Sequence, residues 1–363
     1  MANSKVGLTR LCVSGLLLCI SMSAATQSSA SQTHPIAQQL FIQGDELIKQ
    51  DQFTRGISLL ENAASKGHAQ AAFELASLYE VGLVVEEDTR LAIKYYEMAV
   101  SKGYRDAHFN LALLLSSPFT PNNDLSRARE VVEVIADQGD IEAQFLLANL
   151  MKKKLHDAPS KPGKAFYWLQ HAANSGHGKA QYQLATEYMK GLHVSRSAKT
   201  AFKWFNRAAM QNVAEAHYNL ALMHEKGDGV SKNMAKAVDW YESAAELGSV
   251  NAQQNLGLKY LAGEGVEPMP RQAIKYLSKA ANSGSTESQL LLAKVYQSGY
   301  QDLIKVDLIN AETWYLRAAR KGVAEAQYEL ALMLRDRNDT EGAELWGRRA
   351  TAGGHLAAAK LYQ

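Results

Sequence analysis

The sequence predicts an all-α protein built as a solenoid of stacked antiparallel helix pairs, and three observations carry this prediction. Leucine recurs at intervals of 36, 36, 37, 36, 36, 36 and 38 residues. A glycine or asparagine lies eight residues before each leucine, and an alanine-rich segment lies before that. A period in this range is typical of arrays of two-helix units. The leucines are Leu75, Leu111, Leu147, Leu184, Leu220, Leu256, Leu292 and Leu330.

The residue eight positions before each leucine is called the anchor, and positions in a repeat are counted from it. Glycine, with asparagine as its single substitute, favours a left-handed backbone conformation that ends a helix. We therefore expect one helix to end at the anchor and a second to begin after it. A ninth anchor, Gly354, opens a short last unit. The other anchors are Gly67, Gly103, Gly139, Gly176, Asn212, Gly248, Gly284 and Gly322.

The segment after each anchor predicts the first helix of a repeat. Its fourth, eighth and twelfth positions share one face of a helix. They carry alanine or serine, then leucine, then most often tyrosine, with His224 in place of tyrosine in one repeat. Small residues allow a neighbouring backbone to approach closely, while leucine and tyrosine fill the remaining volume. We expect this face, including Leu220 and His224, to be buried.

The segment before each anchor predicts the second helix. An aromatic or large apolar residue, such as Trp204 or Trp240, lies eight positions before the next anchor. Glycine turns such as residues 227–230 and 263–266 separate the two helices and need positive backbone angles. Residues 116–125 and 152–163 lack this glycine turn, so we expect their loops to follow a different path.

Residues 216–245, AHYNLALMHEKGDGVSKNMAKAVDWYESAA, resemble the Sel1-like repeat family, a branch of the tetratricopeptide-like solenoids. The resemblance covers the chain from about Phe53 to its C-terminus. It implies a right-handed α-solenoid with about eight repeats of roughly 36 residues in residues 67–353. We expect a capping helix pair in residues 35–66, with helices at Pro35 to Gln50 and Phe53 to Ser65, and a capping helix in residues 354–363.

Residues 1–25 have the pattern of a secretory signal peptide, with cleavage near Ala25. We expect residues 26–34 to form a flexible leader. Cys12 and Cys19 both fall in the signal, and Leu18 before Cys19 favours cleavage over lipidation, which needs a small residue there. The mature chain would be periplasmic or secreted, would hold no cysteine, and would have no integral membrane segment.

The mature chain carries little that points to chemistry. Removal of the two basic signal residues leaves 37 basic and 37 acidic residues, which argues against a nucleic-acid partner. The sequence lacks S-x-x-K, G-x-S-x-G, H-E-x-x-H and Walker motifs. His217 and His224 would lie about 10 Å apart on one helix, too far to share a metal ion. Histidines that follow anchors, such as His68 and His355, are expected to cap helices or form turns. We expect no enzyme activity, no cofactor and no metal.

The sixth and seventh positions of the first helix form the candidate partner-binding surface. In tetratricopeptide-like folds the first helices line the concave side, so the resemblance places these residues toward the groove. Aromatic rings offer rigid contact area and amides can bond a partner's backbone. The same residues could instead serve only to pack the scaffold, and the sequence leaves both readings open. The candidates are Phe73, Phe109, Asn110, Phe145, Tyr182, Gln183, Tyr218, Asn219, Asn255 and Tyr328.

Two functions fit these features. The favoured one is an exported, non-enzymatic scaffold or adaptor that binds a protein or peptide partner. The resemblance implies roles in envelope assembly, signalling or host interaction for such proteins. The alternative is a penicillin- or peptidoglycan-binding protein of hydrolase type, as described for cysteine-rich secreted relatives. This chain lacks their paired cysteines and any evident nucleophile.

Overall fold

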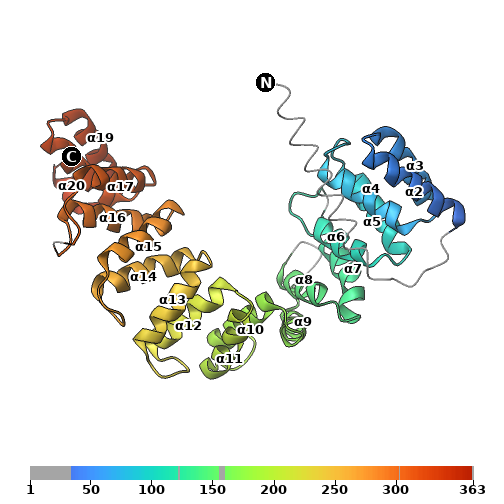
Figure 1. Cartoon of the computed structure of the whole chain (residues 1–363), viewed down its shortest axis with the longest axis horizontal. Coiled ribbons are helices and arrows are strands. Elements are labelled where there is room, and N and C mark those ends of the chain that lie inside the picture. Colours follow the sequence, from blue (N-terminus) through green and yellow to red (C-terminus); the bar gives the residue numbers. More distant parts are fainter. Residues whose placement is uncertain (1–33, 122, 155–159, 302, 362–363) are drawn as a thin grey trace. The chain divides into compact units, whose positions relative to one another are not determined.

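The computed structural model describes residues 34–121, 123–154, 160–301 and 303–361, and these residues form nineteen helices in consecutive antiparallel pairs (Figure 1). The predicted signal peptide, both cysteines and most of the leader lie outside the described residues. The described residues contain no helix long and apolar enough to cross a membrane.

Each helix pair consists of a first and a second helix, and the last described unit has the first helix α20 alone. The first helices are α2 (Pro35–Lys49), α4 (Ala69–Val81), α6 (Arg105–Leu115), α8 (Ile141–Lys152), α10 (Gly178–Lys190), α12 (Ala214–Lys226), α14 (Val250–Ala262), α16 (Thr286–Ser298), α18 (Ala324–Asp336) and α20 (Leu356–Leu361). The second helices are α3 (Phe53–Ser65), α5 (Thr89–Ser101), α7 (Leu125–Asp137), α9 (Pro162–Asn174), α11 (Ala198–Ala209), α13 (Met234–Glu246), α15 (Pro270–Asn282), α17 (Leu308–Arg320) and α19 (Thr340–Ala352).

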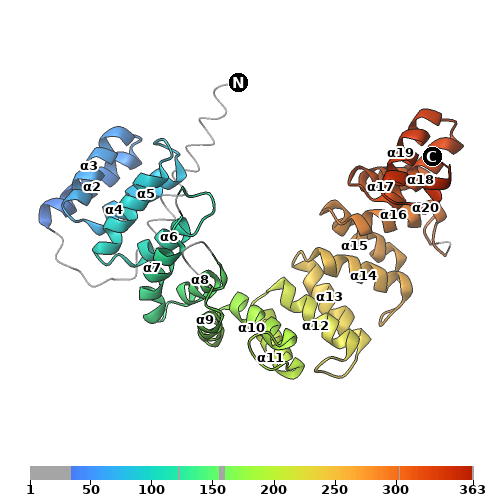
Figure 2. The same cartoon turned by 180° about the vertical axis from the view of Figure 1, so that it is seen from behind.

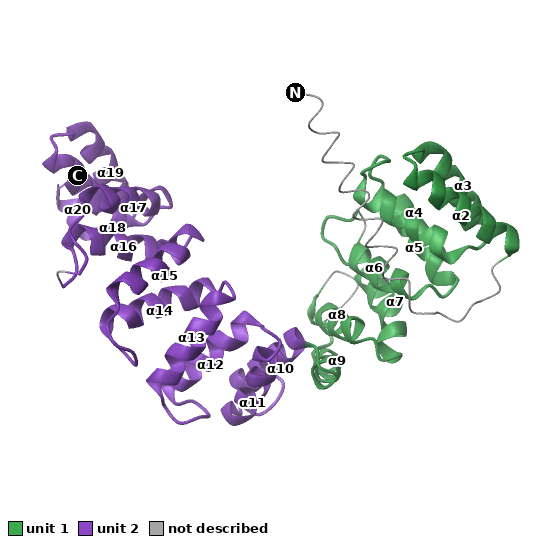
Figure 3. Ribbon diagram, viewed as in Figure 1, with its two compact units in different colours: residues 1–177 green, residues 178–363 purple. Residues whose placement is uncertain are grey.

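The chain divides into two compact units, which are described separately (Figure 3). Unit 1 comprises Met1–His177 and unit 2 comprises Gly178–Gln363. In each unit a helix packs on the helices that precede and follow it in sequence. The helix pair expected between Pro35 and Ser65 is present as α2 and α3.

The anchors end helices as predicted. Backbone φ is +87° at Gly67 and +92° at Gly248, and Asn212 adopts +58°. This is the left-handed region, in which glycine has no side chain to clash and asparagine is tolerated. The amide of Gly248 donates to the carbonyl of Ala245, so the anchor also satisfies a carbonyl that the helix end leaves free.

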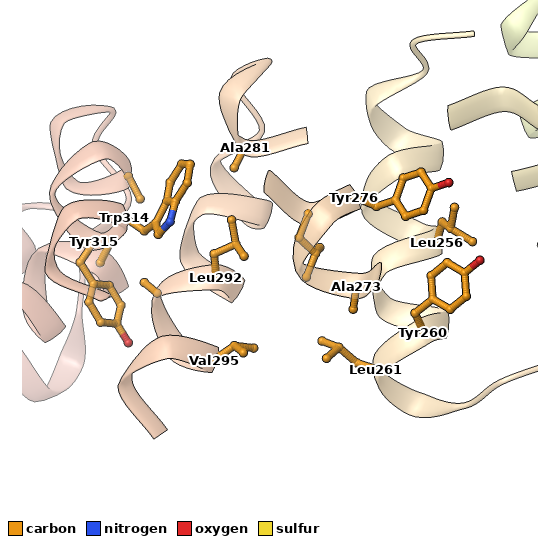
Figure 4. Close-up of a cluster of buried hydrophobic side chains, with 14 of the residues drawn as sticks. Leu256, Tyr260, Leu261, Ala273, Tyr276, Ala281, Leu292, Val295, Trp314 and Tyr315 are labelled. Carbon is orange, nitrogen blue, oxygen red and sulfur yellow. The ribbon is translucent and has the colours of Figure 1, made fainter. Parts of the chain in front are cut away.

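The periodic positions form the core. Leu220, Leu256 and Leu292 are fully buried, which confirms the burial predicted for the eighth position. Figure 4 shows Leu292 of α16 and Trp314 of α17 among the buried side chains of unit 2. His224 is also buried and lies edge-on to the Phe202 ring, with 5.6 Å between ring centroids, as expected for a core substitute of tyrosine.

The fifth position after the anchor is also buried in most repeats, and this was not predicted from the sequence. In four repeats a glutamine at the fifth position donates a hydrogen bond to the carbonyl of an alanine near the end of the preceding helix. Gln253 Nε2 lies 3.1 Å from the oxygen of Ala245, and Gln289 Nε2 lies 2.9 Å from that of Ala281. The bond fixes a first helix to the end of the second helix before it. Glutamine at this position recurs in the sequence, so the signal was present.

The turns between paired helices use two solutions. Gly227 and Gly229 have φ of +77° and +74°. A Cβ on Gly229 would lie 2.5 Å from the carbonyl carbon of Ala198, so this glycine also permits a close approach to the start of α11. The loop between α6 and α7 lacks such glycines. There Thr120 is buried, and its Oγ1 donates to the carbonyl of Leu114 at 2.6 Å.

The end of α8 is closed by a buried arginine side chain that comes from the preceding helix. Arg129 of α7 donates to the carbonyls of Leu150 and Lys153 at 2.9 and 2.7 Å, which satisfies acceptors at the end of α8. The different loop paths predicted for residues 116–125 and 152–163 are therefore confirmed for their described parts.

Candidate functional site

The first helices of unit 2 are tied side by side. Lys259 of α14 pairs with Glu225 of α12 at 2.7 Å, and Lys294 of α16 pairs with Glu325 of α18 at 2.5 Å. Ser285, which caps α16, donates to Gln254 of α14 at 2.9 Å. Figure 2, viewed from behind, labels α12, α14, α16 and α18 in this order along the unit. The outer side chains at the third, sixth, seventh and tenth positions of these four helices are called the first-helix face.

Most sixth-position rings pack against side chains of the same unit. Phe73 is buried between Tyr96 and Tyr104, with ring centroids 5.7 and 4.9 Å away. The other predicted rings are half-exposed. Packing on a neighbour leaves one side of such a ring available to a partner. The ring pairs are Phe145 with His177, Tyr182 with Phe205, Tyr218 with Tyr241, and Tyr328 with His355; Phe109 is half-exposed as well.

The amides of the seventh position bond within the protein. Asn110 Nδ2 donates to the hydroxyl of Tyr96 at 3.3 Å. Asn255 Nδ2 lies 3.4 and 3.3 Å from the hydroxyls of Tyr218 and Tyr241. Asn219 Nδ2 donates to the carbonyl of Glu215 in its own helix at 2.7 Å, and Gln183 is half-exposed. These hydrogen bonds occupy donors that were predicted to bind a partner's backbone.

A buried tyrosine connects the first-helix face to the second helices. Tyr241 of α13 is fully buried, and its hydroxyl donates to Glu225 at 2.6 Å. Burial is the largest cause that raises the pKa of Tyr241 above its usual value, and the bond to Glu225 adds to it. Burial alone would raise the pKa of Glu225, but hydrogen bonds from Lys259 and Tyr241 outweigh it and lower that pKa. We call Tyr241, Glu225 and Asn255 the tyrosine strut of unit 2.

Unit 1 contains a strut of the same kind. Tyr96 of α5 is fully buried and donates to Glu80 at 2.6 Å, while Asn110 donates to Tyr96. Asn110 and Asn255 were predicted from the sequence, but the tyrosine and the glutamate that bond with them were not. In both units the strut has a glutamate thirteen residues after the anchor and a tyrosine sixteen residues after that glutamate. This spacing is visible in the sequence and could have predicted the strut.

The seventh position of the first repeat carries Glu74, whereas most other repeats have an amide or leucine there. This carboxyl group is buried and accepts a hydrogen bond from Gln70 Nε2 at 3.0 Å. Burial raises its pKa to about 7, Asp45 adds to the rise, and Gln70 and Lys49 oppose it. The group is therefore close to half-protonated at neutral pH.

Half-exposed leucines at the tenth position are a further feature of the face that the sequence analysis missed. Leu258 of α14 is 40% exposed, and Leu222 of α12 and Leu332 of α18 are half-exposed. In α16 the tenth residue is Lys294, and leucine occurs at the seventh position as Leu291. Leucine at the tenth position is visible in the sequence, but its exposure depends on how neighbouring repeats pack.

The histidines after anchors have structural partners. His68 Nδ1 accepts the amide of Ala71 at 3.1 Å, and His355 Nδ1 accepts that of Ala358 at 3.2 Å, so both cap helices as expected. His217 bonds the carbonyl of Ala209 at 2.9 Å. Within the described residues, no group of three His, Cys, Asp or Glu side chains is placed to hold a metal ion.

The comparisons with known proteins agree with this architecture. The Sel1 repeat model matches residues 37–68, 69–104, 141–177, 178–213, 214–249, 250–285, 286–323 and 324–355. A Sel1 repeat protein from Oxalobacter formigenes is 30% identical, with a TM-score of 0.74, over 82% of this chain and 88% of its own. A search of curated proteins gives no match.

A second solved structure is similar in fold. It is c5321, a protective antigen of uropathogenic Escherichia coli strains that displays an SLR fold. It is 24% identical, with a TM-score of 0.68, over 89% of this chain and 70% of its own. At this identity the likeness shows the fold alone.

Proposed function

We propose that this chain, which belongs to the Sel1 repeat family, is an exported, non-enzymatic scaffold that binds a protein partner on its first-helix face. Arrays of stacked repeats present extended surfaces that other proteins use for docking. The observation that carries the proposal is the set of half-exposed side chains at equivalent positions of α12, α14, α16 and α18, helices that bonds between neighbours hold together. Such pre-organisation lowers the entropic cost of binding.

Export rests on the signal-like pattern of residues 1–25, and we propose that the mature chain acts in the periplasm or outside the cell. Envelope assembly, signalling and host interaction are the processes in which we expect such a scaffold. Its partner is a protein or a peptide, with a possible association with the envelope or peptidoglycan. A protein partner suits the face because large aromatic, amide and leucine side chains contribute most of it.

Affinity capture from an envelope fraction, with residues 26–363 as bait and mass spectrometry as readout, tests the proposal. The chain offers a matched pair of variants. Asn219 on α12 and Asn206 on α11 are both half-exposed, and each donates to the carbonyl four residues before it, at 2.7 and 2.8 Å. Asn219→Arg should weaken capture of a recurring partner about tenfold, because it places a long charged side chain in the contact surface. Asn206→Arg should leave capture unchanged.

An equal loss of capture with both variants, or no loss with either variant, would contradict a first-helix docking face. The hydrolase alternative has its own test in the same preparation. Nitrocefin turnover or peptidoglycan cleavage that disappears on changing one polar residue would replace the scaffold proposal with an enzymatic one.

A further inference from the structure

The second helices of unit 2 carry an exposed row of positive side chains. On α11 and α15 a cation recurs at every fourth residue, which places the cations on one side of each helix. These six side chains are all exposed. They are Lys199, Lys203 and Arg207 on α11, and Arg271, Lys275 and Lys279 on α15.

The same side of the neighbouring second helices continues the row. It contributes Arg317 and Ile309 on α17, and Arg349 and Leu345 on α19, all of them exposed. Among these positions, which lie in described helices, the single carboxylate is Asp239 on α13. Figures 1 and 2 label α11, α13, α15, α17 and α19 in this order along unit 2. We call the six cations of α11 and α15 and these five residues the outer stripe.

The excess of positive charge is specific to these helices. Among all charged residues of α11, α13, α15, α17 and α19, eleven are basic and six are acidic. The first helices of unit 2, α10 to α20, have seven of each, and the second helices of unit 1 have six basic and five acidic residues. The nearly neutral chain therefore concentrates its positive charge on one set of helices.

Half of the six carboxylates on these helices already have partners. Within the described residues, none of the eight cations of the outer stripe forms an ion pair with a carboxylate. The row is therefore available to an external anion. The engaged carboxylates are Glu242, which accepts the hydroxyl of Tyr260, Glu312, which pairs with Arg337, and Glu344, which pairs with Arg348.

Aromatic rings beneath the cations limit where the charges can lie. The guanidinium carbon of Arg207 is 4.5 Å from the ring centroid of Trp204, and Lys275 Nζ is 5.5 Å from that of Tyr276. A guanidinium stacked on a ring keeps N–H groups at its edge, where phosphate oxygens can accept them. Arg349 stacks on Trp346 in the same way.

The outer stripe combines its cations with exposed aliphatic side chains. Ile309 is 77% exposed and Leu345 is 49% exposed. An anionic bilayer offers phosphate-bearing headgroups to the cations and an apolar layer directly beneath them to the aliphatic groups. A sugar polymer would instead need ring faces on which to stack, but Tyr276 and Trp314 are 8% and 9% exposed. An acidic protein segment would match the cations without using the aliphatic groups.

We infer that the outer stripe of unit 2 binds the headgroups of an anionic lipid bilayer, and that Ile309 and Leu345 enter the interfacial layer. This surface is separate from the first-helix face, so the inference goes beyond the proposed function. Each Lys or Arg near an anionic bilayer contributes about fivefold in affinity, so the number of cations determines the strength of binding.

Sedimentation of residues 26–363 with lipid vesicles tests the inference. Vesicles of phosphatidylcholine mixed with phosphatidylglycerol should bind the protein, and vesicles of phosphatidylcholine alone should not. Binding should weaken when salt rises from about 0.05 M to about 0.5 M, because exposed charges are screened.

The chain offers a matched pair of lysines for this assay. Lys275 and Lys94 are both exposed, and each Nζ lies 5.5 Å from the ring centroid of the tyrosine that follows it. Lys275→Gln in unit 2 should lower the partition coefficient about fivefold, whereas Lys94→Gln in unit 1 should change it less than about twofold. Equal melting temperatures of the two variants and the parent protein check that folding is unaffected.

A second pair of variants tests the aliphatic groups. Ile309→Ser should weaken vesicle binding at least about threefold, because a hydroxyl gains nothing from the interfacial layer. Leu258→Ser on the first-helix face, where Leu258 is 40% exposed, should leave vesicle binding unchanged. Equal binding by the Ile309→Ser variant and the parent protein would overturn the entry of Ile309 into the lipid.

Several outcomes would overturn the lipid assignment. These are no vesicle binding, equal binding with and without phosphatidylglycerol, and equal effects of Lys275→Gln and Lys94→Gln. An acidic protein or a polysaccharide that binds through Lys275, while vesicles do not bind, would also replace it. Asn219→Arg should leave vesicle binding unchanged, so failure of the proposed function and failure of this inference are distinguishable.

Discussion

Two loops of unit 1 close their helix pairs by a different chemistry from the glycine turns of unit 2, although the turn after α4 in unit 1 also uses a left-handed glycine, Gly82. In unit 2 the turn after α12 uses Gly227 and Gly229 in left-handed conformations. In unit 1 the loops after α6 and α8 use the side chains of Thr120 and Arg129 to bond carbonyls at helix ends. Both solutions satisfy the same unpaired acceptors. The difference teaches that a repeat needs its helix ends satisfied and its helix faces matched, whereas the sequence of the turn can vary.

The tyrosine strut is common to both units, but its surroundings are not. Tyr241 and Glu225 in unit 2 are joined by Lys259, which neutralises the glutamate. In unit 1 the first repeat has the buried carboxyl of Glu74 at a position where unit 2 has amides or leucine in most repeats. Equivalent repeat positions therefore carry different charged groups in the two units.

The largest expected effect tests whether the two cores are equivalent. Leu220→Ala in unit 2 and Leu111→Ala in unit 1 should each reduce the free energy of unfolding by about 2–5 kcal/mol, because both leucines are buried and leave a cavity. Hydrogen exchange resolved by unit measures each loss separately. Leu345→Ala, at an exposed site, serves as the control. A loss below about 1 kcal/mol in only one unit would show that the cores are not equivalent.

The glycine turn offers a sharper test. Gly229 and Gly248 both have positive φ, +74° and +92°, so alanine should cost about 1–2 kcal/mol at either from backbone strain alone. At Gly229 the new Cβ would also collide with the backbone of Ala198, whereas at Gly248 nothing lies within 4 Å. We expect about 3 kcal/mol for Gly229→Ala, measured by chemical unfolding. Equal costs would show that the close approach does not determine the choice of glycine.

Glu74 should make unit 1 sensitive to pH. Its pKa is about 7 in the folded protein against an ordinary 4.5, so the folded state binds the proton more tightly. The resulting stabilisation is complete below pH 4.5 and is lost as pH rises through 7. It amounts to at most about 3 kcal/mol, since each pKa unit corresponds to 1.36 kcal/mol. Glu74→Gln should flatten the fall in melting temperature between pH 5 and 8; an unchanged slope would exclude Glu74 as its source.

The smallest effect concerns the ion pair between Lys259 and Glu225 in the strut of unit 2. Lys259→Met should cost about 1 kcal/mol or less, because the side chains remain partly solvated. The pKa of Glu225 is lowered in the folded protein, so its contribution is present above the ordinary glutamate pKa and disappears as pH falls. Urea unfolding at pH 7 and pH 3 measures the cost of Lys259→Met with Glu225 ionised and with Glu225 largely protonated. A cost that is the same at both values would contradict an electrostatic role.

Much of the fold could be read from residue spacing. The anchors, the buried leucines and the substitution of His224 for tyrosine all lie where their period placed them, because helix faces repeat with fixed geometry. The candidate site was less accessible to this reasoning. The resemblance to tetratricopeptide-like folds placed Tyr218 and Asn255 toward the groove, but it did not reveal that Asn255 already bonds the hydroxyls of Tyr218 and Tyr241.

The sequence by itself determined the repeat, because helix periodicity, glycine φ preference and side-chain volume act within or between adjacent segments. The tertiary structure decided which side chains remain free at the surface. The strut joins Tyr241 to Glu225, sixteen residues earlier, and Lys259 reaches the same carboxylate from the next repeat. Such bonds within and between repeats engage polar groups, while Leu258 stays 40% exposed, and only the packed helices establish which residues meet.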